Sequence, residues 1–134
     1  MMLDQETKQR LIQKALQVRS RAYAPYSNYQ VGAALLTAGG EIYTGVNVEN
    51  AAYPTSMCAE RSAVFSAVSD GERDFQAVAV ATRNGGTPCG SCRQVLAEFG
   101  LDIAVLIVDQ QGSIVQETTV SELLPGAFQG EDLD

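Results

Sequence analysis

The chain has 134 residues, of which 46% are hydrophobic and 19% are charged, as in an ordinary soluble globule. Nine basic residues face sixteen acidic ones, and this net charge of −7 argues against a nucleic acid polymer as partner. The first residues lack the apolar run of a secretion signal, and no segment approaches the roughly 18 apolar residues of a membrane span. Three cysteines cannot form a closed disulfide framework, so we expect reduced thiols, a cytoplasmic location and no membrane partner.

Helical periodicity predicts a first helix from Asp4 to about Ala22, which Pro25 would prevent from continuing. Segments 31–37 and 41–47 flank Ala-Gly-Gly and predict a β-hairpin. The remaining elements, in chain order, are a helix over 58–71, a strand over 75–82, a helix over 89–100, strands over 103–109 and 113–118, and a short helix over 120–124.

This alternation of strands and helices predicts one α/β domain over residues 1–134, with a central mixed five-stranded sheet in a three-layer α-β-α arrangement. Right-handed crossovers would make strands 41–47, 75–82 and 103–109 parallel. Both intervening helices would then begin at the carboxyl edge of those strands. Open α/β sheets bind their ligands at that edge, so the starts of the two helices are the candidate site.

All three cysteines fall at these two helix starts. Cys58 opens the first crossover helix, and Cys89 and Cys92 open the second with the spacing of one helical turn. The positive end of each helix dipole favours thiolate over thiol, and three convergent thiolates are typical of a zinc site. Neither a histidine nor a further cysteine is left to complete a structural site. We therefore expect water as the fourth ligand, activated by the metal at neutral pH.

Two charged residues directly follow Cys58. Glu60 is two positions beyond Cys58 in the first turn of the same helix, and is expected to act as the base without binding the metal. Three thiolates on a dication leave a net charge of −1, which weakens the pull of the metal on water. The guanidinium of Arg61 could restore part of that electrophilicity by donating to the sulfurs.

Other interpretations of the same residues remain. The Cys89-x-x-Cys92 pair could be a redox pair or two buried small side chains. A carboxylate could complete a structural zinc in a non-catalytic interaction module. Glu60 and Arg61 could be ordinary surface charges of a first helical turn.

The motif Cys58-Ala-Glu60 followed by Pro88-Cys89-Gly-Ser-Cys92 resembles the signature of the zinc-dependent nucleoside and nucleobase deaminases. Further matching blocks spread over about residues 5–132 resemble the small, homotetrameric cytidine deaminases of the cytidine and deoxycytidylate deaminase family. These blocks are AYAPYSNYQVGAALLT, GVNVENAAY, CAERSAVFSAV, PCGSCRQV and ELLPGAF.

The resemblance implies a cytidine deaminase-like fold with one Zn²⁺ per subunit and hydrolytic deamination of cytidine and deoxycytidine in pyrimidine salvage. It assigns Asn47 and Glu49 to the ribose 3′-hydroxyl, and two such side chains on an extended segment would point to one side. It places Tyr29 against the substrate, where the family usually has Phe, so the extra hydroxyl needs a partner. The backbone around Ala59 and the 88–92 loop would meet the base edge.

The resemblance also implies a homotetramer, in which Phe128 reaches the site of a neighbouring subunit and Tyr53 lies at a subunit boundary. A deaminase of nucleoside antibiotics, of the blasticidin type, is an alternative with the same chemistry. The Asn47-x-Glu49 pair favours an ordinary ribose over such an antibiotic.

Overall fold

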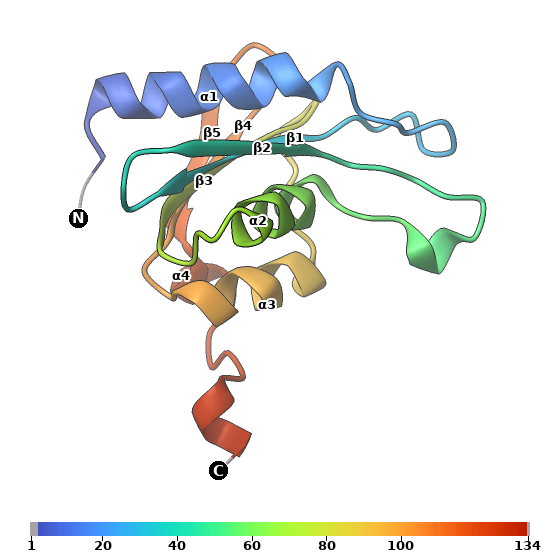
Figure 1. Ribbon diagram of the computed structural model, residues 1–134. Coiled ribbons are helices and arrows are strands. Elements are labelled where there is room, and N and C mark those ends of the chain that lie inside the picture. The colour runs from blue at the N-terminus through green and yellow to red at the C-terminus, as the bar shows by residue number, and fades with distance from the viewer. Residues whose placement is uncertain (1–2, 134) are drawn as a thin grey trace.

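The computed structural model describes residues 3–133 and consists of one five-stranded sheet between two layers of helices (Figure 1). α1 covers one face of the sheet, and α2 and α3 lie on the other. The elements are α1 (Gln5–Arg19), β1 (Gly32–Thr37), β2 (Ile42–Val46), α2 (Ala59–Ser69), β3 (Phe75–Ala81), α3 (Gly90–Phe99), β4 (Ala104–Val108), β5 (Ile114–Thr119) and α4 (Val120–Leu123), with 3-10 turns η1 (Tyr53–Thr55) and η2 (Gly130–Leu133). The predicted three-layer fold is confirmed. Among residues 3–133 no helix combines the length and the apolarity that a membrane crossing requires.

The strands are arranged in the order β2-β1-β3-β4-β5. β1 is antiparallel to both of its neighbours, β3 and β4 are parallel, and β5 is antiparallel to β4. β2, β3 and β4 therefore run in the same direction, as predicted, although β1 separates the first two. α2 follows β2 and α3 follows β3, so both helices start at the same edge of the sheet.

The first helix ends earlier than the sequence pattern predicts. α1 stops at Arg19, with Ser20 as its C-cap, so Pro25 is not the residue that ends it. The chain leaves the helix because Tyr23 pairs with the segment after β2: its N–H donates to the Asn47 carbonyl at 3.0 Å, and its carbonyl accepts from the Glu49 N–H at 2.8 Å. Tertiary pairing thus overrides the helical periodicity of residues 20–22.

Alternating residues of the buried strands supply two separate cores. Along β3, Ala77, Ala79 and Ala81 face α1, and Val78 and Val80 face α2 and α3. Small side chains on the α1 side let that helix approach closely. A Cβ added at Gly32 of β1 would lie 2.2 Å from the carbonyl oxygen of Ala15 in α1. The strand thus needs glycine at this point because the helix backbone occupies the space of a side chain.

A second glycine allows α2 to pack closely on the edge strand β2. A Cβ added at Gly45 of β2 would lie 2.4 Å from the backbone nitrogen of Ala63. Glycine at this point therefore lets the backbone of α2 lie directly against β2.

Candidate active site

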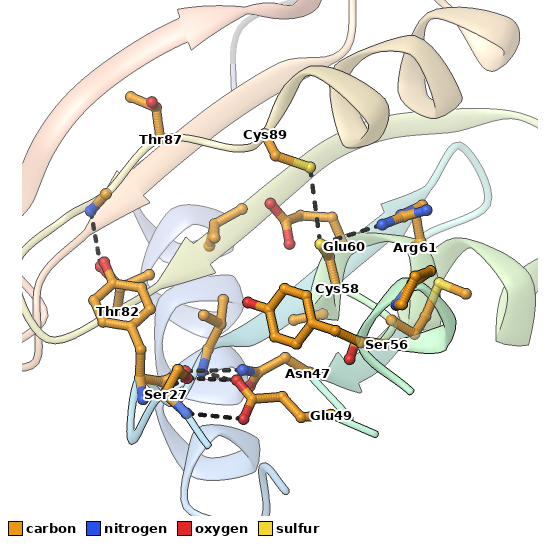
Figure 2. Close-up of a pocket in the computed structure, with 18 residues that line it drawn as sticks. Ser27, Asn47, Glu49, Ser56, Cys58, Glu60, Arg61, Thr82, Thr87 and Cys89 are labelled. Carbon is orange, nitrogen blue, oxygen red and sulfur yellow. Dashed lines mark hydrogen bonds between the residues drawn. The ribbon is translucent and has the colours of Figure 1, made fainter. Parts of the chain in front are cut away.

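The three cysteines meet where α2 and α3 begin, and Figure 2 shows two of them, Cys58 and Cys89. Cys58 is the N-cap of α2 and Cys89 is the N-cap of α3. The Sγ atoms of Cys58 and Cys89 are 3.8 Å apart, those of Cys89 and Cys92 are 3.4 Å apart, and all three lie within 4.8 Å of one another. Sulfurs bound tetrahedrally to zinc at about 2.3 Å are roughly 3.8 Å apart, so the cluster has the dimensions of a zinc site.

The pKa shifts of Cys58 and Cys92 indicate that the cluster binds a cation. Hydrogen bonds from Cys92 and Arg61 lower the pKa of Cys58 to about 5. The pKa of Cys92 is raised above its ordinary value, first by its hydrogen bond with Cys58 and then by burial. Cys58 and Cys92 therefore cannot both ionise in each other's presence unless a positive ion shares them. A soft divalent ion such as Zn²⁺ meets that requirement.

No carboxylate in the described part of the chain completes the cluster. Among residues 3–133, the group of ligand atoms that lie within 4.8 Å of one another contains only the three cysteines, and the chain has no histidine. A structural zinc completed by a side-chain carboxylate is therefore not supported. Three protein ligands are the set that catalytic zinc sites use.

Glu60 lies in the first turn of α2 and is buried, with 4% of its surface exposed. Burial raises the pKa of its carboxyl group to about 7, and the nearby Cys58 thiolate adds to the rise. Its own backbone N–H and the Arg61 guanidinium lower the pKa of Glu60 and only partly offset that effect. A carboxyl group with a pKa near neutrality can take up and release protons at the pH of the cell.

Arg61 lies on the other side of the sulfurs and donates from Nη2 to Cys58 Sγ at 3.3 Å. The contact raises the pKa of the guanidinium further above its ordinary value, so Arg61 carries a permanent positive charge beside the thiolates. Its buried Nε finds no hydrogen-bond acceptor among residues 3–133. The side chain is therefore held here mainly by the charge of the sulfur cluster.

A pocket of about 510 Å³ opens next to the cysteine cluster. This volume lies in the range of small-molecule sites. Seven residues expected to contact substrate or metal line it: Tyr29, Asn47, Glu49, Cys58, Ala59, Glu60 and Cys89. Tyr53 and Arg61 also line it. The pocket therefore has a metal-binding end and, at Asn47 and Glu49, a polar end (Figure 2).

At the polar end, both side chains hold backbone groups of the segment before β1. Asn47 accepts from the Val31 N–H at 2.8 Å and donates to the Tyr29 carbonyl at 2.8 Å. Glu49 accepts from the backbone N–H groups of Tyr26 and Ser27 and from the Ser27 hydroxyl. Asn47 and Glu49 thus shape the pocket wall in addition to facing it.

The hydroxyl of Tyr29 has a partner. It donates to Asn84 Oδ1 at 2.6 Å, and the guanidinium of Arg83 lies 5.5 Å from the centre of the Tyr29 ring. Neither Arg83 nor Asn84 stands out in the sequence, because nothing local links the loop after β3 to residue 29.

The two residues expected at subunit contacts, Tyr53 and Phe128, lie in different places relative to the pocket. Tyr53, in η1, lines the pocket of its own chain and is 66% exposed. Phe128 is 56% exposed but does not line this pocket; its carbonyl accepts a hydrogen bond from Gln94.

Sequence analysis missed four polar residues that line the pocket, namely Ser27, Ser56, Thr82 and Thr87. The Ser27 hydroxyl donates to Glu49 and accepts from the Tyr29 N–H. The Thr82 hydroxyl accepts from two N–H groups of the loop that follows β3. The only available signal for them was their proximity in sequence to a recognised motif.

Three convergent thiols, a buried carboxyl group with a raised pKa and an adjoining pocket, at the edge of an α/β sheet, define a zinc-dependent hydrolase. The comparisons with known proteins agree. Residues 5–115 match the family described as "Cytidine and deoxycytidylate deaminase zinc-binding region". A cytidine deaminase of Halalkalibacterium halodurans is 52% identical over 130 residues, which cover 95% of this chain and 98% of the relative.

A cytidine deaminase of Sporosarcina psychrophila is also 52% identical, over 128 residues that cover 93% of each chain. Among solved structures, a cytidine deaminase of Burkholderia pseudomallei superimposes with a TM-score of 0.86 at 46% identity, covering 90% of this chain and 98% of that one. The chain therefore belongs to the cytidine and deoxycytidylate deaminase family, with Cys58, Cys89 and Cys92 as its zinc ligands.

Proposed function

We propose that the protein deaminates cytidine and deoxycytidine by hydrolysis, forming uridine or deoxyuridine and ammonia. The observation that carries the proposal is the position of buried Glu60 beside three zinc-binding sulfurs, in a pocket whose other end carries Asn47 and Glu49. We take residues 1–134 as one catalytic domain, since both cores of the described part share a single sheet.

When bound, zinc supplies a water molecule that is nucleophilic at neutral pH. Glu60 accepts a proton from the attacking water and delivers it to N3 of the pyrimidine, which makes C4 electrophilic. Glu60 then takes the proton of the new hydroxyl group on C4 and passes it to the amino group, which leaves as ammonia when the C4–N bond breaks and the C4 carbonyl forms. A pKa near 7 suits a group that acts first as a base and then as an acid, which typically contributes about 10²–10⁴ in rate.

Arg61 supports this chemistry through the sulfurs. Its guanidinium donates to Cys58 Sγ and offsets part of the negative charge of the three thiolates. The backbone at Ala59, which is fully buried at the start of α2, and the 88–92 loop flank the metal end and would orient the base edge.

At the polar end, Asn47 and Glu49 retain capacity for one more partner each. One N–H of the Asn47 amide is not used by the Tyr29 carbonyl, and Glu49 has accepted three of about four possible hydrogen bonds. Both can therefore bind a 3′-hydroxyl. Because ribose and deoxyribose share that hydroxyl, we expect both nucleosides to react.

We also propose a homotetramer in the cytoplasm. Phe128 and Tyr53 are large aromatic side chains exposed by more than half, which a single chain does not require and a subunit interface would cover. Phe128, remote from its own pocket, would complete the pocket of a neighbouring subunit. A reducing compartment would keep the three zinc ligands as thiols.

The test is ammonia release from cytidine, deoxycytidine and blasticidin S, measured with and without a zinc chelator. We expect both nucleosides to be deaminated, the antibiotic to be a poor substrate, and the chelator to stop the reaction. Turnover of the antibiotic alone would identify a nucleoside-antibiotic deaminase. Zinc without any ammonia release would identify a non-catalytic zinc module.

A further inference from the structure

Two walls of the pocket, far apart in sequence, are joined through one side chain. Tyr29, in the segment before β1, donates its hydroxyl proton to Asn84 Oδ1 in the loop between β3 and α3, 55 residues away. Tyr29 lines the pocket, and the loop that contains Asn84 ends at the zinc ligand Cys89. The hydrogen bond therefore links the wall that faces the nucleoside to the loop that carries the metal.

The loop that carries Asn84 is held in a fixed shape. Thr82, which is 2% exposed, accepts from the N–H groups of Gly85 and Gly86, both at 2.8 Å. Asn84 also forms an isolated β-bridge with Asp109 at the end of β4. The backbone of Asn84 is thus held in place, and the hydrogen bond to its side chain restricts the orientation of the Tyr29 ring.

The hydroxyl of Tyr29 also lies directly over Gly86. A Cβ added at Gly86 would be 2.6 Å from the Tyr29 hydroxyl oxygen but 3.7 Å from the ring carbon that bears it. Gly86 does not have a positive φ, so backbone conformation does not require glycine here. The requirement comes from the hydroxyl alone, which shows how closely the side chain is seated.

We propose that Asn84 is a positioning residue that acts through Tyr29, fixing the aromatic wall against which the nucleoside binds. The inference rests on the proposed function. Arg83, whose guanidinium lies 5.5 Å from the centre of the ring, adds a second restraint from the same loop. A ring already held in its bound orientation loses less freedom when substrate enters, so the bond strengthens binding of the nucleoside. It acts equally on substrate and transition state, so it lowers KM and leaves kcat unchanged.

The first experiment compares the wild-type zinc enzyme with Asn84→Leu and Asn84→Asp in steady-state deamination of cytidine. Leucine has no acceptor, and KM should rise by about threefold to tenfold while kcat stays within about twofold. Aspartate keeps an acceptor oxygen in the same place, and should restore KM. Gln110→Leu, an exposed polar-to-apolar change in the turn after β4, is the matched control.

The second experiment measures coupling. In a Tyr29→Phe background, Asn84→Leu should cause no further rise in KM, because phenylalanine has no hydroxyl and the hydrogen bond to residue 84 is already absent. Equal rises in KM in the two backgrounds would overturn the inference. A fall in kcat with unchanged KM would overturn it as well.

A stability measurement tests the same contact without turnover. Gly86→Ala should lower the Tm in the presence of Tyr29 and should lower it less in the Tyr29→Phe background, where the clash is removed. Equal losses would show that the hydroxyl is not seated over Gly86 and would contradict the inference.

If wild type released no ammonia from cytidine, the proposed function would fail and this inference with it. If wild type were active and Asn84→Leu kept a normal KM, the inference alone would fail.

Discussion

The two ends of the pocket are built in different ways. At the metal end, the hydrogen bonds from Arg61 to Cys58 and from Cys92 to Cys89 link residues three positions apart, and the 3.8 Å contact between the sulfurs of Cys58 and Cys89 joins the two helix starts across 31 positions. At the polar end, the hydrogen bonds of Asn47 and Glu49 span 16 to 23 residues. The metal end is thus set by two helix starts, whereas the polar end exists only once the chain before β1 has folded back onto the chain after β2.

This difference indicates what each end contributes. Substitutions at the metal end should remove either the metal, together with the stability that it adds, or the proton transfer, and should leave the hydrogen bonds of the polar end in place. Substitutions at the polar end should loosen the pocket wall, and so affect stability and binding together. The predictions below test this division.

The largest effect is expected from removing a zinc ligand. Cys89→Ala should lose the zinc, all activity and part of the folding stability, because a metal that binds only the folded chain stabilises it. We expect Tm to fall by more than about 5 °C. Elemental analysis and thermal unfolding measure both changes. Ser91→Ala, an exposed change in the same helical turn, is the control, and a normal zinc content in Cys89→Ala would contradict the ligand set.

The next effect concerns proton transfer alone. Glu60→Gln keeps the size of the side chain but cannot exchange protons, so kcat should fall by at least about 10²–10⁴ while zinc stays bound. Glu98→Gln, on the exposed side of α3, should be fully active. Activity within about tenfold of wild type in Glu60→Gln would exclude this residue as the proton carrier.

Arg61→Gln should have a smaller effect, again at the metal end. Without the guanidinium, the thiolates keep their full negative charge, and zinc affinity or kcat should fall by about 10–100-fold. Competition with a chelator measures the affinity. Arg73→Gln removes an exposed charge elsewhere and should change neither quantity. A wild-type affinity together with a wild-type kcat would show that Arg61 does not influence the metal.

The smallest effect is expected at the polar end and depends on pH. The Ser27 hydroxyl, followed by the backbone N–H groups of Ser27 and Tyr26, holds the pKa of Glu49 below its ordinary value although burial opposes this. Ionised Glu49 therefore stabilises the fold above the ordinary carboxyl pKa of about 4.3, and this contribution is lost as pH falls through its lower folded pKa.

Glu49→Gln should accordingly lower the Tm at pH 7, and the gap to wild type should close as the pH falls below about 4. Thermal unfolding across pH measures the gap. Glu41→Gln, an exposed carboxyl, should follow wild type throughout. A gap that widens in acid would mean that the pKa of Glu49 is raised in the folded state.

The sequence predicts how the zinc ligands converge because each step follows a simple rule. Cys58 caps one helix, the spacing of Cys89 and Cys92 is one turn of another, and the right-handed crossovers between strands of one direction bring both helix starts to one edge of the sheet. The strand periodicity of Ala77 to Ala81 likewise predicts a buried strand, since alternate residues face opposite cores.

The polar end could be predicted only as a pair of residues. The bridge between Tyr23 and Val48, which ends α1 early and brings Ser27 to Glu49, has no local pattern. The partner of the Tyr29 hydroxyl also comes from a loop 55 residues away. Long-range pairing of irregular segments depends on the whole fold, and single-residue propensities carry no information about it.

The shared zinc also acts on the chain as a removable cross-link. It connects Cys58 to Cys89, which are 31 positions apart, and the stretch between them contains α2 and β3, the central strand of the sheet. A closed loop of this kind restricts the unfolded chain as a disulfide does, yet it opens whenever the ion leaves. Loss of the ion should therefore destabilise the folded chain as well as abolish activity.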